Sequence, residues 1–212
     1  SQTLRIVRYD TRGHGASVVS PGPYSVAQLA QDALQILDAL AVERAAFCGI
    51  SMGGITGLSL ALTAPQRLTH LVVANSAAKI GEAAMWAERA AAVRQGGAQA
   101  LSALADTAPQ RWFTAGFAAQ HPAVVQRAQA WIANTPAEGY ASCCDALGAA
   151  DVRAQLGDIA TPTLLIGGEF DPTTTVADAQ LMQAGIAGAR LCVLPTAHLS
   201  NLEVPERFAQ AL

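Results

Sequence analysis

The stretch Phe47-Cys48-Gly49-Ile50-Ser51-Met52-Gly53-Gly54 decides the fold of this 212-residue chain. An apolar run at 45–48 precedes its glycines and a helical pattern that ends near Pro65 follows them, so a sharp strand-to-helix turn is predicted. Its central part fits Gly-x-Ser-x-Gly, in which side chains two positions either side of the serine would clash with the turned backbone. We expect Ser51 to be a nucleophile that the turn lifts to the carboxyl end of a sheet. The alternative is a glycine-rich turn with an incidental serine.

Outward from this turn, apolar runs alternate with helical patterns along most of the chain. The predicted strands are 4–9, 45–48, 71–74, 163–166 and 190–194. The predicted helices are 25–40, one that ends near Pro65, 175–187 and one from Pro205 onward. Ser25 begins the first of these helices, with Gln28 as its partner in a capping box. Strands that alternate with helices predict an α/β fold, in which a mostly parallel sheet has helices on both faces.

The middle of the chain has a different pattern. Residues 79–148 are rich in alanine, follow a helical pattern and contain all three tryptophans. We interpret them as a helical insertion that divides the core into 1–78 and 149–212. An insertion of this length between two strand–helix halves is expected to form a lid over a site.

Both ends of the chain fall inside predicted elements. The strand at 4–9 begins almost at the first residue, and the helix from Pro205 stops at Leu212 after about two turns. We therefore expect N-terminal strands of the sheet to precede Ser1 and the last helix to continue beyond Leu212.

Composition excludes several classes of partner. The chain is 51% hydrophobic and 14% charged, with a formal net charge of −3, so it can bury a large core. This charge balance gives no reason to expect nucleic acid or an anionic membrane as a partner. Neither an apolar run of roughly 20 residues nor a secretory leader is present in the sequence, and we expect a cytoplasmic protein. The sequence gives no oligomeric state.

The four cysteines predict neither a metal site nor a disulfide framework. Cys143 and Cys144 are adjacent, which is not a zinc-binding spacing. Cys48 and Cys192 lie in apolar strand-like runs, where small buried thiols are common. We expect all four to be structural thiols in a reducing compartment.

A serine hydroxyl needs a general base, and the chain has four histidines. His198 follows the last predicted strand directly, in Pro195-Thr196-Ala197-His198-Leu199, and so lies at the same sheet edge as Ser51. His14 is in a turn after the first strand, His70 begins a strand and His121 is in the insertion. His198 is therefore the predicted base, and the alternative is a histidine in a surface loop.

The base needs an acid that orients it, and two carboxylates follow the strand at 163–166. Asp171 precedes a proline in a turn, which favours a carboxylate that points back over the sheet edge, while Glu169 lies two residues earlier. We prefer Asp171. The order Ser51, Asp171, His198 is then the order found in the α/β-hydrolase fold.

The same fold predicts where an oxyanion would bind. The N–H of Met52 and the positive end of the following helix point at the developing charge. The second donor normally comes from a loop after an earlier strand, and no suitable loop precedes Leu4 in this sequence.

Several motifs together resemble 3-oxoadipate enol-lactonases over essentially the whole chain. They are Arg8-Tyr9-Asp10-Thr11-Arg12-Gly13-His14-Gly15, the turn around Ser51, Asn75-Ser76-Ala77-Ala78-Lys79-Ile80-Gly81, Arg111-Trp112-Phe113-Thr114, Glu138-Gly139-Tyr140-Ala141 and His198-Leu199-Ser200-Asn201-Leu202-Glu203. The first two are widespread in the superfamily, and the motifs in the insertion are more discriminating. Two positions depart from the family pattern: Lys79 stands where arginine is usual, and Gly168-Glu169-Phe170-Asp171 replaces a Gly-Thr-His-Asp-like run.

The resemblance implies hydrolysis of 3-oxoadipate enol-lactone in bacterial aromatic catabolism, the β-ketoadipate pathway, with no metal or organic cofactor. Carried over to this chain, it makes Ser51, Asp171 and His198 the triad and the Met52 N–H an oxyanion donor. The carboxylate of such a substrate calls for a cation, and Arg111 beside Trp112 is the candidate, with Lys79 behind it. The alternative is that Arg111 is a solvated residue of the insertion and that the tryptophans belong to its core. Arg12 and His14 are expected to be structural or to support residues that touch the substrate.

Other functions fit the same motifs. One group comprises another carboxylesterase, a cofactor-free haloperoxidase-like esterase and a carbon–carbon hydrolase of ring-cleavage products, because the fold does not choose among these reactions. A ligand-binding protein that keeps the fold without catalysis is a further alternative.

Overall fold

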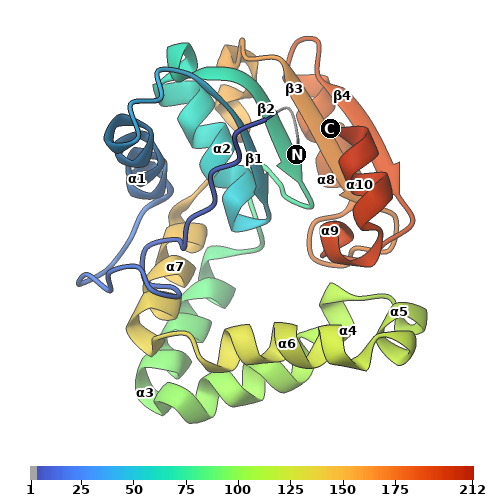
Figure 1. Ribbon diagram of the computed structural model, residues 1–212. Coiled ribbons are helices and arrows are strands. Elements are labelled where there is room, and N and C mark those ends of the chain that lie inside the picture. Colours follow the sequence, from blue (N-terminus) through green and yellow to red (C-terminus); the bar gives the residue numbers. More distant parts are fainter. Residues whose placement is uncertain (1–3) are drawn as a thin grey trace.

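The computed structural model describes residues 4–212 and contains a four-stranded parallel sheet with the strand order β1-β2-β3-β4 (Figure 1). The strands are β1 (Ala45–Ile50), β2 (Leu68–Ala74), β3 (Thr163–Gly168) and β4 (Arg190–Leu194). Each strand pairs with the next in parallel register, for example Val73 with Leu165 and Ile166 with Cys192. Four of the five predicted strands are confirmed.

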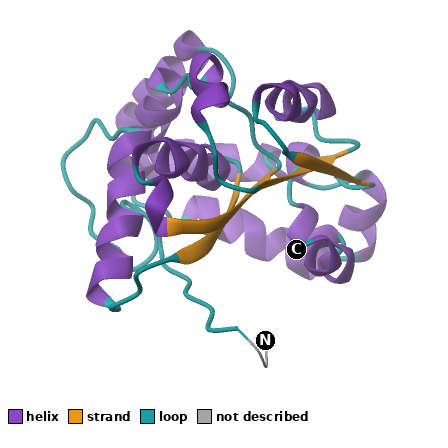
Figure 2. Cartoon of the chain, turned by 90° about the horizontal axis from the view of Figure 1, so that it is seen from above, coloured by secondary structure: helices purple, strands orange, loops and turns teal. Residues whose placement is uncertain are grey.

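Helices cover both faces of the sheet, as the alternating pattern predicted (Figure 2). On one face lie α1 (Val26–Ala39), α2 (Met52–Thr63) and α8 (Val176–Gly185), which bury Leu71, Val73 and Leu165. On the other face, Phe208 of α10 (Pro205–Ala211) packs against Ala74, Ile166 and Leu194. Ser25 accepts a hydrogen bond from the Gln28 N–H at 3.1 Å and caps α1, as its sequence predicted.

The predicted strand at 4–9 is wrong for the described residues, because this segment has no regular secondary structure. Leu4 is 72% exposed and Ile6 is 64% exposed, so the apolar pattern is not buried against a layer of the core. A strand forms by pairing with a neighbour, and 4–9 is not part of the sheet β1–β4. An apolar pattern alone was therefore not enough to predict a strand at 4–9.

Cys48 also departs from its prediction, since it is exposed rather than buried. It lies on β1, which is an edge strand of the described sheet. The residues of β1 alternate between the two faces, and Phe47 packs with the cluster under α2 while Cys48 points to the opposite face. On that face α10 packs against β4, three strands away.

Five helices between β2 and β3 make up the predicted insertion and lie beyond the carboxyl ends of the strands (Figure 1). They are α3 (Ala83–Thr107), α4 (Pro109–Trp112), α5 (Ala115–Gln120), α6 (Pro122–Ala133) and α7 (Ala137–Ala149). Gly97, at φ 52°, interrupts the regular dihedrals of α3. The helices share an apolar cluster that includes Trp86, Val93, Leu101 and Ile132.

Two short 3₁₀ helices and one further turn of α-helix complete the described chain. They are η1 (Pro65–Arg67), η2 (Arg153–Asp158) and α9 (Ser200–Glu203). Within 4–212, none of the helices combines the length and apolar character needed to span a bilayer.

Candidate active site

Ser51 lies between the end of β1 and the start of α2, with φ 54° and ψ −116°. A positive φ is rare for a residue with a side chain, and such backbone strain is concentrated at functional sites. Hydrogen bonds hold the turn: the Ser51 N–H donates to the carbonyls of Ala74 at 3.0 Å and Asn75 at 3.1 Å. The Ser76 hydroxyl donates to the Ser51 carbonyl at 2.7 Å. The strand-to-helix turn predicted from the sequence is therefore present.

One of the two glycines expected to be needed in the turn is needed, and the other is not. A Cβ on Gly49 would lie 2.1 Å from the Gly53 carbonyl oxygen, so the clash predicted on that side of Ser51 is real. A Cβ on Gly53 would meet nothing within 4 Å, and the prediction for that position is wrong. The second tight approach is at Gly54, where a Cβ would lie 2.5 Å from Cβ of Ser76. The close contact of α2 with Ser76, in the loop after β2, explains why glycine is needed at 54.

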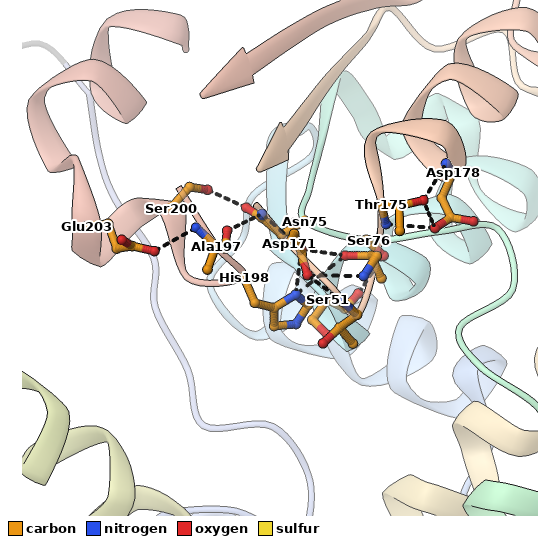
Figure 3. A network of polar contacts seen from close by, with 12 residues as sticks. Ser51, Asn75, Ser76, Asp171, Thr175, Asp178, Ala197, His198, Ser200 and Glu203 are labelled. Atoms are coloured by element: carbon orange, nitrogen blue, oxygen red, sulfur yellow. Dashed lines mark hydrogen bonds and ion pairs between the residues drawn. The ribbon is translucent and has the colours of Figure 1, made fainter. Parts of the chain in front are cut away.

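His198 and Asp171 form a buried pair. His198 Nδ1 and Asp171 Oδ2 are 2.8 Å apart, and their side chains are 5% and 0% exposed. His198 comes from the loop after β4 and Asp171 from the turn after β3, so both lie at the carboxyl edge of the sheet together with Ser51. In Figure 3 the imidazole of His198 points toward Ser51. The structure thus brings together the three residues that the sequence singled out.

The Asp171 carboxylate is surrounded by donors. Oδ1 accepts from the backbone N–H groups of Thr173 at 2.8 Å and Thr174 at 3.1 Å, and Oδ2 accepts from the Thr174 hydroxyl at 2.9 Å. Burial acts to raise the pKa of Asp171, but the hydrogen bond and charge of His198 and the two N–H groups outweigh it and lower the pKa. The carboxylate is therefore kept ionised, as a partner for an imidazolium must be.

Glu169, the other carboxylate considered, occupies a different environment. It is exposed, and its described hydrogen bond is from its own backbone N–H to the Leu194 carbonyl at 2.8 Å. The turn between β3 and Asp171 is closed by a different bond, from the Asp171 N–H to the Gly168 carbonyl at 3.2 Å. The geometry therefore pairs His198 with Asp171.

Asn75 is a site residue that the sequence reasoning missed. Its side-chain amide donates to Asp171 Oδ2 at 3.2 Å and to the Ala197 carbonyl at 3.1 Å, and its Oδ1 accepts from the Ser200 hydroxyl. Its carbonyl accepts from the Ser51 N–H. One buried residue, with a backbone φ of 41°, thus connects the nucleophile turn through its carbonyl with the acid and the histidine loop through its side chain. Its position directly after a strand at the sheet's carboxyl edge was the signal available in the sequence.

Met52 is the first residue of α2, so its N–H lies outside the hydrogen-bond ladder of that helix. It lines a small cavity of about 20 Å³ together with Tyr9, Thr11, Arg12, Leu29, Asp32, Gly53 and Thr56. The N–H of a first helical residue is a suitable donor for developing negative charge.

The three predicted substrate-binding residues lie in different settings. Trp112 ends α4, and its carbonyl accepts from the Leu199 N–H at 3.1 Å, so it touches the histidine loop. Arg111 precedes it and makes a long contact of 3.5 Å to the Thr107 carbonyl. Lys79 is instead paired with Glu82 at 2.6 Å, which offsets its charge.

Arg89 is another cation of the insertion, and the sequence analysis did not single it out. Burial raises the pKa of Tyr140, and the charges of Arg89 and Arg111 act in the opposite direction. Arg89 also lies over the Trp86 ring at 5.0 Å. No motif in the sequence distinguished Arg89 from the other arginines.

Arg12 and His14 have local partners, as expected of structural residues. The Arg12 guanidinium binds Asp32 through two nitrogens and also donates to Ser20 Oγ at 3.0 Å. His14 Nδ1 is 3.3 Å from the Arg12 carbonyl and 4.0 Å from the Cys143 sulfur. Burial raises the pKa of Cys143 to about 12, which keeps this thiol protonated. In the described part of the chain no group of three or more metal-ligating side chains is present.

The fold and the geometry of the site together indicate the class of proteins to which this chain belongs. Residues 1–205 match the family described as alpha/beta hydrolase fold, and the chain belongs to that family.

Particular relatives are also similar to the chain. The 3-oxoadipate enol-lactonase 2 of Acinetobacter baylyi is 49% identical over 207 residues, which are 98% of this chain and 76% of the relative. The 3-oxoadipate enol-lactonase 1 of the same organism is 46% identical over 206 residues, 97% of this chain and 76% of the relative. These similarities confirm the resemblance stated from the motifs.

Solved structures agree with this grouping. The crystal structure of the enol-lactonase from Burkholderia xenovorans superposes with a TM-score of 0.92 at 41% identity, covering 96% of this chain and 77% of that one. A thermophilic esterase from Thermogutta terrifontis superposes with a TM-score of 0.89 at 25% identity, covering 95% and 75%.

Proposed function

We propose that this chain hydrolyses 3-oxoadipate enol-lactone to 3-oxoadipate through an acyl-enzyme on Ser51. The observation that carries the proposal is the buried His198–Asp171 pair beside the strained turn of Ser51, in a chain 49% identical to a 3-oxoadipate enol-lactonase. A small carboxylated lactone is then the substrate, and the cytoplasm, where such intermediates of catabolism arise, is the location.

The first half-reaction opens the ring. His198 takes the proton of Ser51 as the oxygen attacks the lactone carbonyl, and Asp171 stabilises the imidazolium that results. The oxyanion accepts a hydrogen bond from the Met52 N–H at the start of α2. Collapse of the tetrahedral intermediate breaks the ring C–O bond and expels a stabilised enolate, which takes a proton from the imidazolium and becomes the ketone.

The second half-reaction releases the product. Neutral His198 takes a proton from a water molecule, which attacks the acyl-enzyme and passes through a second oxyanion. When this intermediate collapses, the Ser51 oxygen leaves and regains its proton from His198. Atoms and charge balance without a metal or an organic cofactor, and the products are 3-oxoadipate and free enzyme.

Specificity is assigned to the helical insertion, residues 79–148, which acts as a lid over the carboxyl edge of the sheet. Arg111 is the favoured partner for the substrate carboxylate, because it adjoins Trp112, whose carbonyl contacts the histidine loop. Lys79 is the weaker candidate, since Glu82 already neutralises it. Division of the chain into a core (1–78 and 149–212) and this lid follows from the same reasoning.

A substrate panel tests the proposal. The purified enzyme should open the enol-lactone with a kcat/KM at least about 100-fold above that for a neutral aryl ester, a margin within the range of binding-based discrimination. Ser51→Ala is the matched inactive control, and it should abolish both activities. The similarity to an esterase makes a general carboxylesterase the second candidate. Efficient hydrolysis of aryl esters with the lactone left untouched would contradict the lactonase assignment.

A further inference from the structure

Glu203, the last residue of α9, binds two parts of the chain at once. Its Oε2 accepts from the Thr114 N–H at 3.2 Å and from the Thr114 hydroxyl at 2.7 Å. Its Oε1 accepts from the Ala197 N–H at 2.7 Å (Figure 3). Thr114 belongs to the helical insertion, where it caps α5, and Ala197 immediately precedes His198. One carboxylate therefore joins the insertion to the histidine loop.

A second contact fastens the other side of the same loop. The Leu199 N–H donates to the Trp112 carbonyl at 3.1 Å. Residues 112–114 of the insertion are thus bound to the histidine loop just before His198, through Glu203, and just after it, directly. The imidazole is fixed between two attachments to the insertion.

The region around these contacts is closely packed. Ala197 and His198 are buried, and so is Phe113 between the two attachment points. Phe113 in turn stacks on Phe117 of α5 with a centroid distance of 5.4 Å. A shift of the insertion would therefore be transmitted to the residues that flank His198 rather than absorbed by a loose loop.

The chemistry of the contact requires a carboxylate. Three donors converge on two oxygens, and an ionised carboxylate can accept from all of them. A glutamine at 203 would direct its NH₂ group toward at least one of these donors, and a shorter aspartate would not span the distance between Ala197 and Thr114. The strength of charge-assisted hydrogen bonds makes this a firm attachment.

We propose that Glu203 is a positioning residue that couples the placement of the insertion to the orientation of His198. This inference rests on the proposed function, because it assumes that His198 is the base. Glu203 does not touch the reacting atoms; it acts through the backbone at Ala197. Its loss should slow activation of Ser51 while substrate binding by the insertion is little changed.

The test measures the rate at which a fluorophosphonate labels Ser51, together with kcat and KM for an aryl ester. Glu203→Gln should slow both labelling and kcat by about tenfold or more, with KM within about threefold, as expected for the loss of charge-assisted hydrogen bonds. Thr114→Val should reproduce part of this loss, and Thr114→Ser, which restores the hydroxyl, should recover it. Glu206→Gln, an exposed glutamate of α10, is the matched control.

Each outcome separates this inference from the proposed function. If the wild-type enzyme is not labelled, the proposed function fails. If the wild type is labelled and folded Glu203→Gln reacts at the wild-type rate, only the positioning role is overturned. Thermal unfolding reports folding of each variant, and if Glu203→Gln does not fold, the Thr114→Val and Thr114→Ser pair decides. The effects of Thr114→Val and Glu203→Gln should not add, because they break the same contact; full additivity would contradict the coupling.

Discussion

The loops at the carboxyl edge of the sheet hold the Asp171 carboxylate differently from the way the helical insertion holds its two candidate substrate-binding cations, Arg111 and Lys79. At the sheet edge, the Asp171 carboxylate accepts from backbone, hydroxyl, amide and imidazole donors, and Asn75 ties it to the turn of Ser51. In the insertion, Lys79 is paired with Glu82, and the described hydrogen bond of Arg111 is a long one to the Thr107 carbonyl at the end of α3.

The difference in how these side chains are bound separates the residues that carry out the reaction from those that select the substrate. Groups that move protons need a fixed geometry, because small displacements from hydrogen-bond distance cost large factors in rate. Cations that recognise a substrate carboxylate must instead be free to meet it. The comparison therefore predicts large effects on kcat at the sheet edge and smaller effects on KM in the insertion.

Asp171→Asn should have a larger effect than either Asn75→Gly or Arg111→Gln. An amide cannot hold His198 in the required tautomer or stabilise the imidazolium, so kcat should fall by about 10⁴-fold with little change in KM. Steady-state kinetics on the enol-lactone measure this. Glu169→Gln, two residues earlier and exposed, is the matched control and should keep its rate. A loss of equal size at Glu169 would reverse the assignment of the acid.

Asn75→Gly tests the network that sequence reasoning missed. Glycine accepts the positive φ of 41° without strain, so the variant removes the amide while sparing the backbone. Asp171 and Ala197 each lose a donor, and kcat should fall by about ten- to 100-fold, the range expected for one or two buried hydrogen bonds. Asn201→Ala, exposed in α9, serves as the control. A folded Asn75→Gly enzyme with kcat within twofold of wild type would show that Asn75 does not position the triad.

Arg111→Gln should have the smallest effect and a different signature. KM for the enol-lactone should rise by about tenfold, while the kinetics with a neutral aryl ester stay unchanged, because the ester offers no carboxylate for Arg111. Lys79→Gln should raise KM less, since Glu82 already offsets its charge. Arg127→Gln, exposed on α6, is the control. Equal losses with both substrates would mean that Arg111 supports the fold of the insertion rather than the substrate.

Local patterns predicted most of the fold. Four strands, the helices between them and the cap at Ser25 follow from apolar periodicity and capping chemistry that act over a few residues. The strand at 4–9 and the burial of Cys48 failed for one reason: both depend on which layers lie against the residue, and an apolar pattern does not contain that information.

The residues of the site also divide into those that local sequence patterns could select and those that they could not. Ser51, Asp171 and His198 could be selected because each follows a predicted strand at one sheet edge in a known order. Asn75 also follows a predicted strand, but its role and that of Glu203 depend on side chains that meet residues 96 and 89 positions away in the chain, which local patterns do not contain. The need for glycine at 54 rather than at 53 likewise reflects how closely α2 approaches Ser76 in the loop after β2, which only the three-dimensional structure gives.

Labelling of Ser51 by a fluorophosphonate, mapped by peptide mass spectrometry, is the most direct test of the active site as a whole. The wild-type enzyme should carry one label, on Ser51, with loss of esterase and lactonase activity in step with labelling. Ser51→Ala should remain unlabelled, and Ser102→Ala, an exposed serine of α3, should label as the wild type does. A folded wild-type enzyme that takes up no label, or that is labelled at another serine as activity is lost, would contradict the assignment of Ser51 as the nucleophile.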